Sequence, residues 1–276
     1  MSAAAEQAGA APADFNVGEH IMHHILDANY IEIPFTSIHI PLPHIELWGY
    51  DFSITRNVVM MWIASGVLLG MFIAAARRAK EPVPKGLRNA LEAMVLYVRD
   101  EIARKTIDPH YADRYVGYLL TAFFFILACN LLGMIPGLST PTSSISVTAA
   151  LALLTFVISQ GGGIRNYGLF GHIKNLVPHG LPVAILPVIV VVEIISMLAR
   201  PFALAIRLFA NMTAGHVVIV SLISLIFVLK SVFVAGMSVP FALFVYTLEI
   251  LVAFLQAFIF TMLSSLFIGL AVHPSH

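Results

Sequence analysis

Hydrophobic residues along the chain fall into long runs separated by short polar segments. Residues 57–77, 115–135 and 142–160 each contain a run of about twenty uncharged residues, long enough to cross a bilayer core as a helix. Two longer apolar segments follow, 181–230 and 239–272. Gly236 and Pro240 suggest the break that separates them. At 1.5 Å per residue the last segment would be about 50 Å long, so we expect both to be tilted and to form a slanted helical hairpin.

A different pattern occupies residues 85–105, between the first two spans. Apolar residues recur there at helical spacing, for example at Leu91, Val98 and Ile102, with charged residues on the other side. This pattern predicts an amphipathic interfacial helix that lies on the membrane surface. An amphipathic helix packed on a partner protein would show the same spacing.

The fold class that follows is an all-α membrane protein. We expect five membrane-embedded helices and the interfacial helix in a membrane domain of residues 51–276, preceded by a polar segment of residues 1–50 on the outer side. Lys and Arg set the orientation, because residues 77–114 hold nine of the fifteen and residues 1–56 hold one. The N-terminus is therefore expected outside and the C-terminus in the cytoplasm.

Composition supports a membrane protein and excludes several other classes. Hydrophobic residues make up 59% of the chain and charged residues only 11%, whereas soluble domains have about a quarter of their residues charged. The net charge of zero gives no sign of nucleic-acid binding. Cys129 is the single cysteine, which excludes an intrachain disulfide.

Charged residues inside the apolar segments are the strongest functional signal. A charge at bilayer depth costs from about 2.5 to more than 10 kcal/mol, so such residues usually face protein or water and mark a pathway. Glu193, Arg200 and Arg207 are spaced seven apart and Asn211 follows four later, which places all four on one helical stripe. For Glu193 and Arg200, a helix end reaching the headgroups is the alternative.

The last segment carries a second polar stripe, formed by Tyr246, Glu249 and Gln256. Two antiparallel helices with such stripes can enclose a wet path, in which His216 and Glu249 can both exchange protons. Arg207 cannot relay a proton, because a guanidinium stays protonated. Its expected role is to favour deprotonation of a nearby carboxylate, and that carboxylate should come from another subunit.

These residues occur in motifs that resemble subunit a of the F-type ATP synthase. RLFANMTAGH lies after a proline-bearing helix and LQAFIFTML near the C-terminus, while FSITRNVVMMWIA, NLLGMIPG and GHIKNLVPHG mark earlier segments. The resemblance covers nearly everything after residue 50. It implies a proton-conducting stator subunit beside a rotating c-ring, with peripheral-stalk b subunits as further partners, in the cell inner membrane.

The resemblance also implies roles for individual residues. Arg207 matches the essential arginine that faces the ring carboxylate and prevents a direct leak. Asn211, His216, Glu249 and Gln256 match positions of the inlet half-channel on the outer side, and Glu193 and Ser196 match positions of the outlet half-channel on the cytoplasmic side.

Two positions depart from some members of the family. Histidine and acid are exchanged between positions 216 and 249, which suits a pair that acts as a unit. Gly133 stands where some members have an aspartate, and it receives no role.

Other functions have less support in the sequence. A self-contained ion channel or secondary transporter is the main alternative, although the five unequal segments show no inverted repeat. A structural subunit without transport would leave Arg207 and Glu249 unexplained. The P-loop pattern does not occur, so we expect no nucleotide chemistry and no cofactor. His20 and His24 could share a helical face and bind a metal, but a solvated polar segment is the favoured interpretation.

Overall fold

The computed structural model describes residues 30–32, 39–43, 46–47, 50–51, 53–77, 86–135, 138–175, 186–229 and 231–273. They belong to two compact units. The main unit comprises Asp27–Met212 and Ile250–His276, and the described part of the hairpin unit is Thr213–Glu249. The two longest helices are each divided between the two units, which are described separately.

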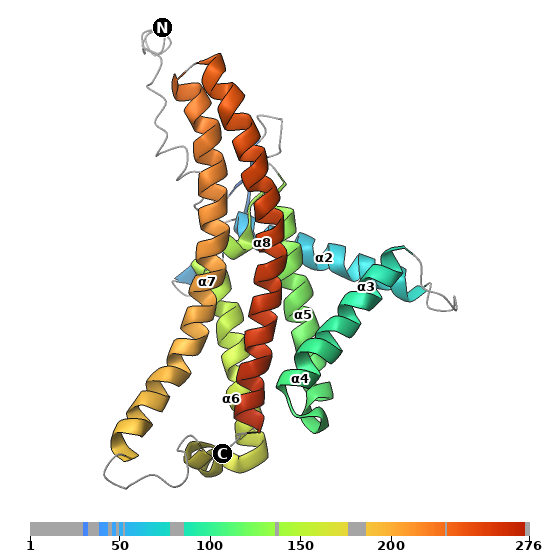
Figure 1. Ribbon diagram of the computed structural model, residues 1–276, viewed down its shortest axis with the longest axis vertical. Helices are drawn as coiled ribbons and strands as arrows, with labels where there is room; N and C mark the ends of the chain where they lie inside the picture. Colours follow the sequence, from blue (N-terminus) through green and yellow to red (C-terminus); the bar gives the residue numbers. More distant parts are fainter. Residues whose placement is uncertain are drawn as a thin grey trace. The chain divides into compact units, whose positions relative to one another are not determined.

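Five helices are long and apolar enough to cross a membrane, as the hydrophobic runs predict. They are α2 (Arg56–Arg77), α5 (Pro109–Gly133), α6 (Ile145–Asn175), α7 (Leu186–Leu229) and α8 (Val232–Val272). Figure 1 shows them as the dominant elements of the fold. An all-α membrane protein whose last two helices are long is therefore confirmed.

Some helix boundaries differ from the sequence expectation for identifiable reasons. α5 begins at Pro109 instead of residue 115, because Asp108 caps it by accepting a hydrogen bond from the His110 amide at 2.9 Å. α8 begins at Val232 instead of residue 239, and Pro240 lies inside the helix. α6 continues past residue 160 as far as Asn175, with a sharp bend at Gly168, where φ is 71° and ψ is 169°. A positive φ of this kind is easily adopted only by glycine.

The polar segment before the first helix contains two short antiparallel hairpins among its described residues. β1 (Tyr30–Glu32) pairs with β2 (His39–Pro41), and β3 (Glu46–Leu47) pairs with β4 (Tyr50–Asp51). His20 and His24, proposed above as a weak metal site, lie outside the described residues.

The amphipathic segment forms a helix that changes its pitch in the middle. It comprises α3 (Leu87–Leu96), the π-helical η1 (Tyr97–Ala103) and α4 (Arg104–Thr106). Leu91, Val98 and Ile102 of its apolar stripe are buried in a core shared with α5. These three residues are thus covered by the chain's own helices, whereas the placement of the segment on the membrane surface stays a prediction.

The core of the main unit is built around α5. Leu119, Phe123 and Ile126 of that helix are buried together with residues of α7 and α8, including Leu204, Leu208, Phe260 and Ile268. α6 runs alongside the C-terminal half of α8 (Figure 1), and Gly163 lets them meet closely, because a Cβ there would lie 2.8 Å from the Ala271 carbonyl oxygen.

Polar side chains join α5, α6 and α8 inside this apolar packing. The Thr155 hydroxyl lies 2.6 Å from the Tyr118 hydroxyl and 3.3 Å from that of Ser264. Ser159 donates to the Phe267 carbonyl oxygen at 2.9 Å. Satisfied polar groups of this kind are expected between helices that pack in a lipid environment.

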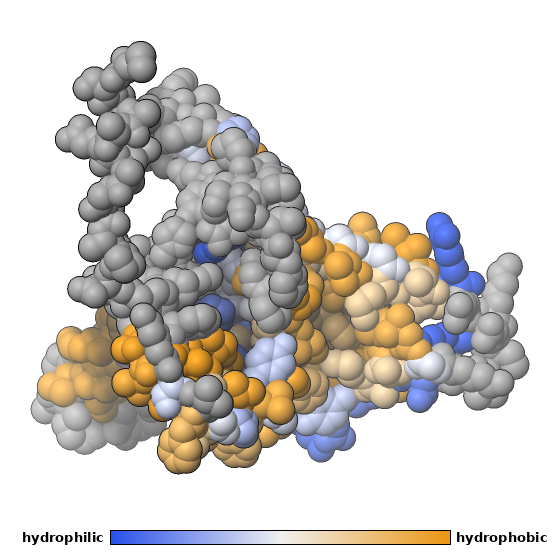
Figure 2. All heavy atoms as spheres, turned by 90° about the horizontal axis from the view of Figure 1, so that it is seen from above, coloured by the Kyte–Doolittle hydropathy of each residue, from blue (hydrophilic) through white to orange (hydrophobic). Residues whose placement is uncertain are grey.

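Large apolar side chains remain exposed on all five long helices, for example Trp62, Leu131, Leu153, Val192 and Leu251. On the face seen in Figure 2, apolar residues cover most of the described surface. A surface of this composition is suited to lipid or to other membrane subunits.

Candidate functional site

Arg207 lies on α7 in the main unit, with Leu204 and Leu208 buried on either side of it along the helix. Its own side chain is half-buried. Among the described residues, it forms no hydrogen bond and no ion pair. A guanidinium with five donors and no partner among the described residues is available to an anion supplied from outside.

The face of α7 that carries Arg207 is open and lined by small residues. Ala203, Ala210 and Asn211 are three or four positions from Arg207, and all three are exposed. Small residues let a neighbouring helix approach closely in a membrane. The sequence had indicated such an approach from Ala203 and from Ala214, which is exposed as well.

Glu193 and Arg200 form an ion pair two turns apart on the same helix. The Arg200 Nη2 to Glu193 Oε1 distance is 3.1 Å. The Arg200 guanidinium carbon also lies 5.9 Å from the centre of the Phe267 ring, within reach of a cation–π contact. Glu193 was the one intrachain acid considered for Arg207, and it is paired with Arg200 instead. Ser196, half-buried, lies between these two residues along the helix.

Asn211 and Gln256 connect α7 to α8 within the main unit. The Asn211 side-chain amide donates to Gln256 Oε1 at 2.8 Å. Gln256 is only 1% exposed, and its Nε2 has no hydrogen-bond partner among the described residues. A buried amide donor without a partner is uncommon, and it indicates that water or another molecule accepts its hydrogen bond.

Glu249 and His216 both lie in the hairpin unit. Glu249 is 7% exposed, and its carboxylate packs against Gly215, where a Cβ would lie 2.8 Å from Oε1. His216 is the next residue along α7 and is half-buried, as is Tyr246 on α8. The absence of a side chain at position 215 therefore provides the space for the Glu249 carboxylate.

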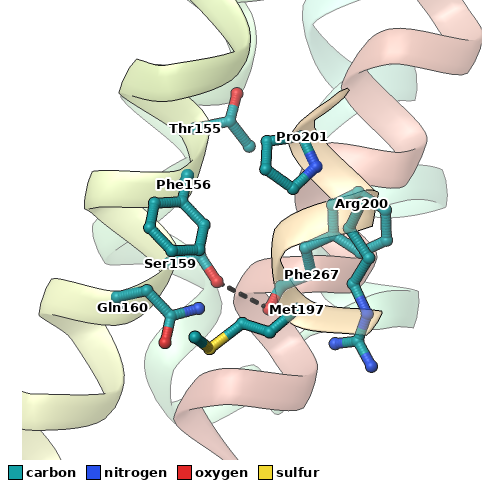
Figure 3. A pocket seen from close by; sticks show the side chains of 8 residues that line it. All are labelled: Thr155, Phe156, Ser159, Gln160, Met197, Arg200, Pro201 and Phe267. Atoms are coloured by element: carbon teal, nitrogen blue, oxygen red, sulfur yellow. Dashed lines mark hydrogen bonds between the residues drawn. The ribbon is translucent and has the colours of Figure 1, made fainter. Parts of the chain in front are cut away.

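A small cavity between α6, α7 and α8 was not foreseen from the sequence. It measures about 20 Å³ and is lined by four residues of α6, three of α7 and one of α8: Thr155, Phe156, Ser159, Gln160, Met197, Arg200, Pro201 and Phe267. Figure 3 shows Gln160 and Arg200 on opposite sides of it. The seven- and four-residue spacing of Thr148, Thr155 and Ser159 was the available sequence signal for this polar face.

Within the described ranges, no three His, Cys, Asp or Glu side chains come together in a way that could hold a metal ion. The polar groups described above are those suited to moving or repelling protons. They are carboxylates, amides, hydroxyls, one imidazole and fixed guanidinium charges.

The sequence profile described as "ATP synthase A chain" matches residues 58–269 of the chain. This chain belongs to the ATP synthase A chain family. ATP synthase subunit a of Chloroherpeton thalassium is 48% identical over 261 residues, which cover 92% of this chain and 77% of that relative. ATP synthase subunit a 2 of Prosthecochloris aestuarii is 49% identical over 268 residues, covering 95% and 82%. ATP synthase subunit a of an Anaeromyxobacter species is 43% identical over 308 residues, covering 98% and 75%.

Membership of the ATP synthase A chain family agrees with the resemblance found in the sequence motifs. Together with the five apolar helices, it establishes a multi-pass membrane subunit of the ATP synthase. It does not favour the alternative of a self-contained transporter. The candidate residues for proton movement all lie on α7 and α8. The matched range includes the whole of α7 and all of α8 except its last three residues.

Proposed function

We propose that the chain is the proton-conducting stator subunit of an F-type ATP synthase, with Arg207 facing the carboxylates of a rotating c-ring. The observation that supports this proposal most strongly is the half-buried Arg207 without an ionic partner among the described residues, on a helix face lined by Ala203 and Ala210. A ring helix that packs on this face would bring its carboxylate to the guanidinium.

The charge of Arg207 would act on the ring in two ways. It lowers the pKa of an approaching carboxylic acid, because the ionised form gains an opposite charge, so the proton is released. It also repels a proton that moves directly between the two sides of the membrane. Neither action requires Arg207 to give up its own proton.

The inlet half-channel on the outer side would use His216, Glu249, Asn211 and Gln256. Glu249 in its pocket beside Gly215 can accept and release a proton, as can His216. The buried Gln256 amide, with one donor unpartnered among the described residues, would bind a water of the proton path.

The outlet half-channel on the cytoplasmic side would use Glu193 and Ser196. Pairing with Arg200 fixes the Glu193 carboxylate on α7, one turn away from Ser196. A proton released by the ring would pass these groups toward the cytoplasm.

The N-terminus would lie outside, the C-terminus inside, and b subunits would be further partners.

This subunit would bind no nucleotide and perform no covalent chemistry of its own. Its contribution is the path that lets the electrochemical gradient turn the ring. Each elementary charge moved across 100 mV supplies roughly 2.3 kcal/mol.

The test is replacement of Arg207 in the assembled complex. We expect Arg207→Ala to abolish ATP synthesis driven by an imposed proton gradient, because the ring carboxylate then keeps its proton. Arg88→Ala is the matched control, since Arg88 already has a partner in Glu92 and lies outside α7 and α8, and it should retain measurable synthesis. Synthesis at the wild-type rate by Arg207→Ala complexes that contain the ring would refute the role of Arg207.

A further inference from the structure

The His172 side chain, near the end of α6, is buried in a fixed position against the preceding part of the same helix. The bend at Gly168 turns the last part of α6 away from the helix axis. The imidazole packs against Gly163, where any Cβ would overlap with ring atoms Cε1 and Nδ1. His172 is 8% exposed, so the ring is held by its surroundings and does not sample solvent freely.

One hydrogen bond connects this imidazole to the cavity described above. His172 Nε2 lies 2.7 Å from Gln160 Oε1. Because a carbonyl oxygen can only accept, Nε2 is the nitrogen that carries the proton. His172 Nδ1 has no partner among the described residues, so this bond is the polar contact that orients the ring.

Gln160 in turn forms part of the cavity wall. Figure 3 shows its amide nitrogen on the side of Met197, whereas the amide oxygen points elsewhere. Without the bond from His172, the amide could rotate and present its oxygen instead. The histidine therefore determines which end of the Gln160 amide faces the cavity.

The cavity suits one water molecule. Its volume of about 20 Å³ exceeds the roughly 10–15 Å³ that a single water requires. Four of its lining residues are polar, namely Thr155, Ser159, Gln160 and Arg200. The Thr155 hydroxyl points away from the other labelled side chains in Figure 3 and bonds to Tyr118 and to the Leu151 carbonyl oxygen, so Ser159, Gln160 and Arg200 are the polar residues left to contact a water. A water beside Arg200 would lie next to the ion pair that this arginine forms with Glu193.

We propose that the cavity between α6, α7 and α8 is a single-water site of the proton outlet, and that His172 is its positioning residue, acting through Gln160. The inference rests on the proposed function, because it takes Glu193 as part of the outlet. The water would solvate the Glu193–Arg200 pair on its inner side and offer a proton acceptor there. His172 itself would not need to change its protonation state.

Two substitutions of His172 distinguish its proposed role, which is to orient Gln160, from a role of the ring's shape and from a role of the ring as a proton carrier. His172→Gln places a side-chain amide donor near the position of Nε2 but cannot act as a proton carrier. His172→Phe keeps a planar ring but has no donor for Gln160. Each is measured in proteoliposomes that contain the whole ATP synthase, as the rate of ATP synthesis under an imposed proton gradient per assembled complex.

We expect His172→Gln to stay within about twofold of wild type and His172→Phe to lose about three- to tenfold, the effect of one missing hydrogen bond. Gln160→Leu should show a similar loss, and the double variant Gln160→Leu with His172→Phe should be no slower than either single variant. Additive losses in the double variant, or a loss in His172→Gln as large as that in His172→Phe, would overturn the assignment.

Arg207→Ala in the same assay keeps this inference separate from the proposed function. Wild-type rates in His172→Phe, together with inactive Arg207→Ala, would refute only the role of His172. Wild-type rates in Arg207→Ala would refute the proposed function itself. Purification of each variant with its ring, and its heat-dissociation midpoint, exclude failure to assemble as the cause of a loss.

Discussion

At the scale of single residues, two arginines seven positions apart on α7 have different surroundings. Arg200 is neutralised by Glu193 and stacks near Phe267, whereas Arg207 has no ionic partner among the described residues. Both have the same intrinsic chemistry. The presence or absence of a partner among the described residues therefore distinguishes these two charges.

Gly215 offers a second test at this scale. We expect Gly215→Ala to slow ATP synthesis about tenfold, because the new Cβ would lie 2.8 Å from Glu249 Oε1 and displace the carboxylate. The rate under an imposed proton gradient is the measurement.

Gly236→Ala is the matched control for that change, since a Cβ at Gly236 would meet nothing within 4 Å. It should leave the rate unchanged. Equal rates in the two variants would show that the position of the Glu249 carboxylate does not limit proton entry.

Residue types and spacing predicted part of this geometry. The stripe of Glu193, Arg200 and Arg207 followed from their seven-residue spacing, and the Asn211–Gln256 contact joins two helices on which polar stripes had been predicted. The Glu193–Arg200 pairing was not predicted, because helical spacing gives neighbours on a face and does not select the rotamers that meet. The space that Gly215 leaves for Glu249 depends on how two helices pack, which the linear sequence does not contain.

At the scale of elements, the segment Leu87–Thr106 is fastened to α5 by charges as well as by its apolar stripe. Arg99 and Arg104 both bind Asp100, and Arg104 also reaches Asp113 of α5 at 3.0 Å. The hydrogen bond from Arg99 lowers the pKa of the Asp100 carboxyl below its ordinary value. The same bond raises the pKa of Arg99.

This cluster predicts a pH-dependent contribution to stability. A carboxyl whose pKa is lowered in the folded state stabilises that state above its unfolded pKa of about 3.9, and the contribution disappears as pH falls through the folded value. Asp100→Asn should therefore lower the heat-dissociation midpoint of the purified complex by about 1–2 °C at pH 7, since exposed pairs contribute little. At pH 3 the difference between the variant and the wild type should be smaller than at pH 7.

Glu92→Gln serves as the control for Asp100→Asn, because its contact with Arg88 is longer, at 3.8 Å. We expect no shift at either pH. A difference between Asp100→Asn and wild type that persists unchanged at pH 3 would contradict the role of the carboxylate charge.

The hydrophobic pattern predicted the five long helices, but it did not predict several of the residues at which they begin and end. Hydrophobic runs mark the part of a helix that lipid surrounds, whereas α5 extends beyond its run because Asp108 and Pro109 form a favourable start. The bend at Gly168 was also missed, because the predicted span ended at residue 160 and left Gly168 outside the helix. Without that bend, the proximity of His172 to Gln160 could not be anticipated.

At the scale of the whole molecule, the exposed apolar residues on five helices require an environment that the chain alone does not supply. Lipid can cover much of this surface. The face around Arg207 differs because it combines small residues with a cation that has no ionic partner among the described residues, and acyl chains cannot compensate such a charge.

A ring of acidic helices should therefore remain with this subunit after gentle extraction. We expect the detergent-solubilised complex to contain c subunits when it is purified through a tag on this chain. Arg207→Ala should weaken that association, because the cation is lost from the contact, whereas Gly236→Ala should not. Recovery of the chain without any c subunit from intact membranes would contradict the proposed partner.

The contact between Gly133, at the end of α5, and Thr140, which precedes α6, has a consequence for engineering this family. Gly133 packs against Thr140 so closely that any Cβ at position 133 would overlap with both the side chain and the backbone of that threonine. The aspartate found there in some relatives cannot be grafted onto this scaffold by a point substitution. A chimera would need to exchange residues 133–144 as one cassette, so that the incoming acid arrives with a loop shaped to receive it.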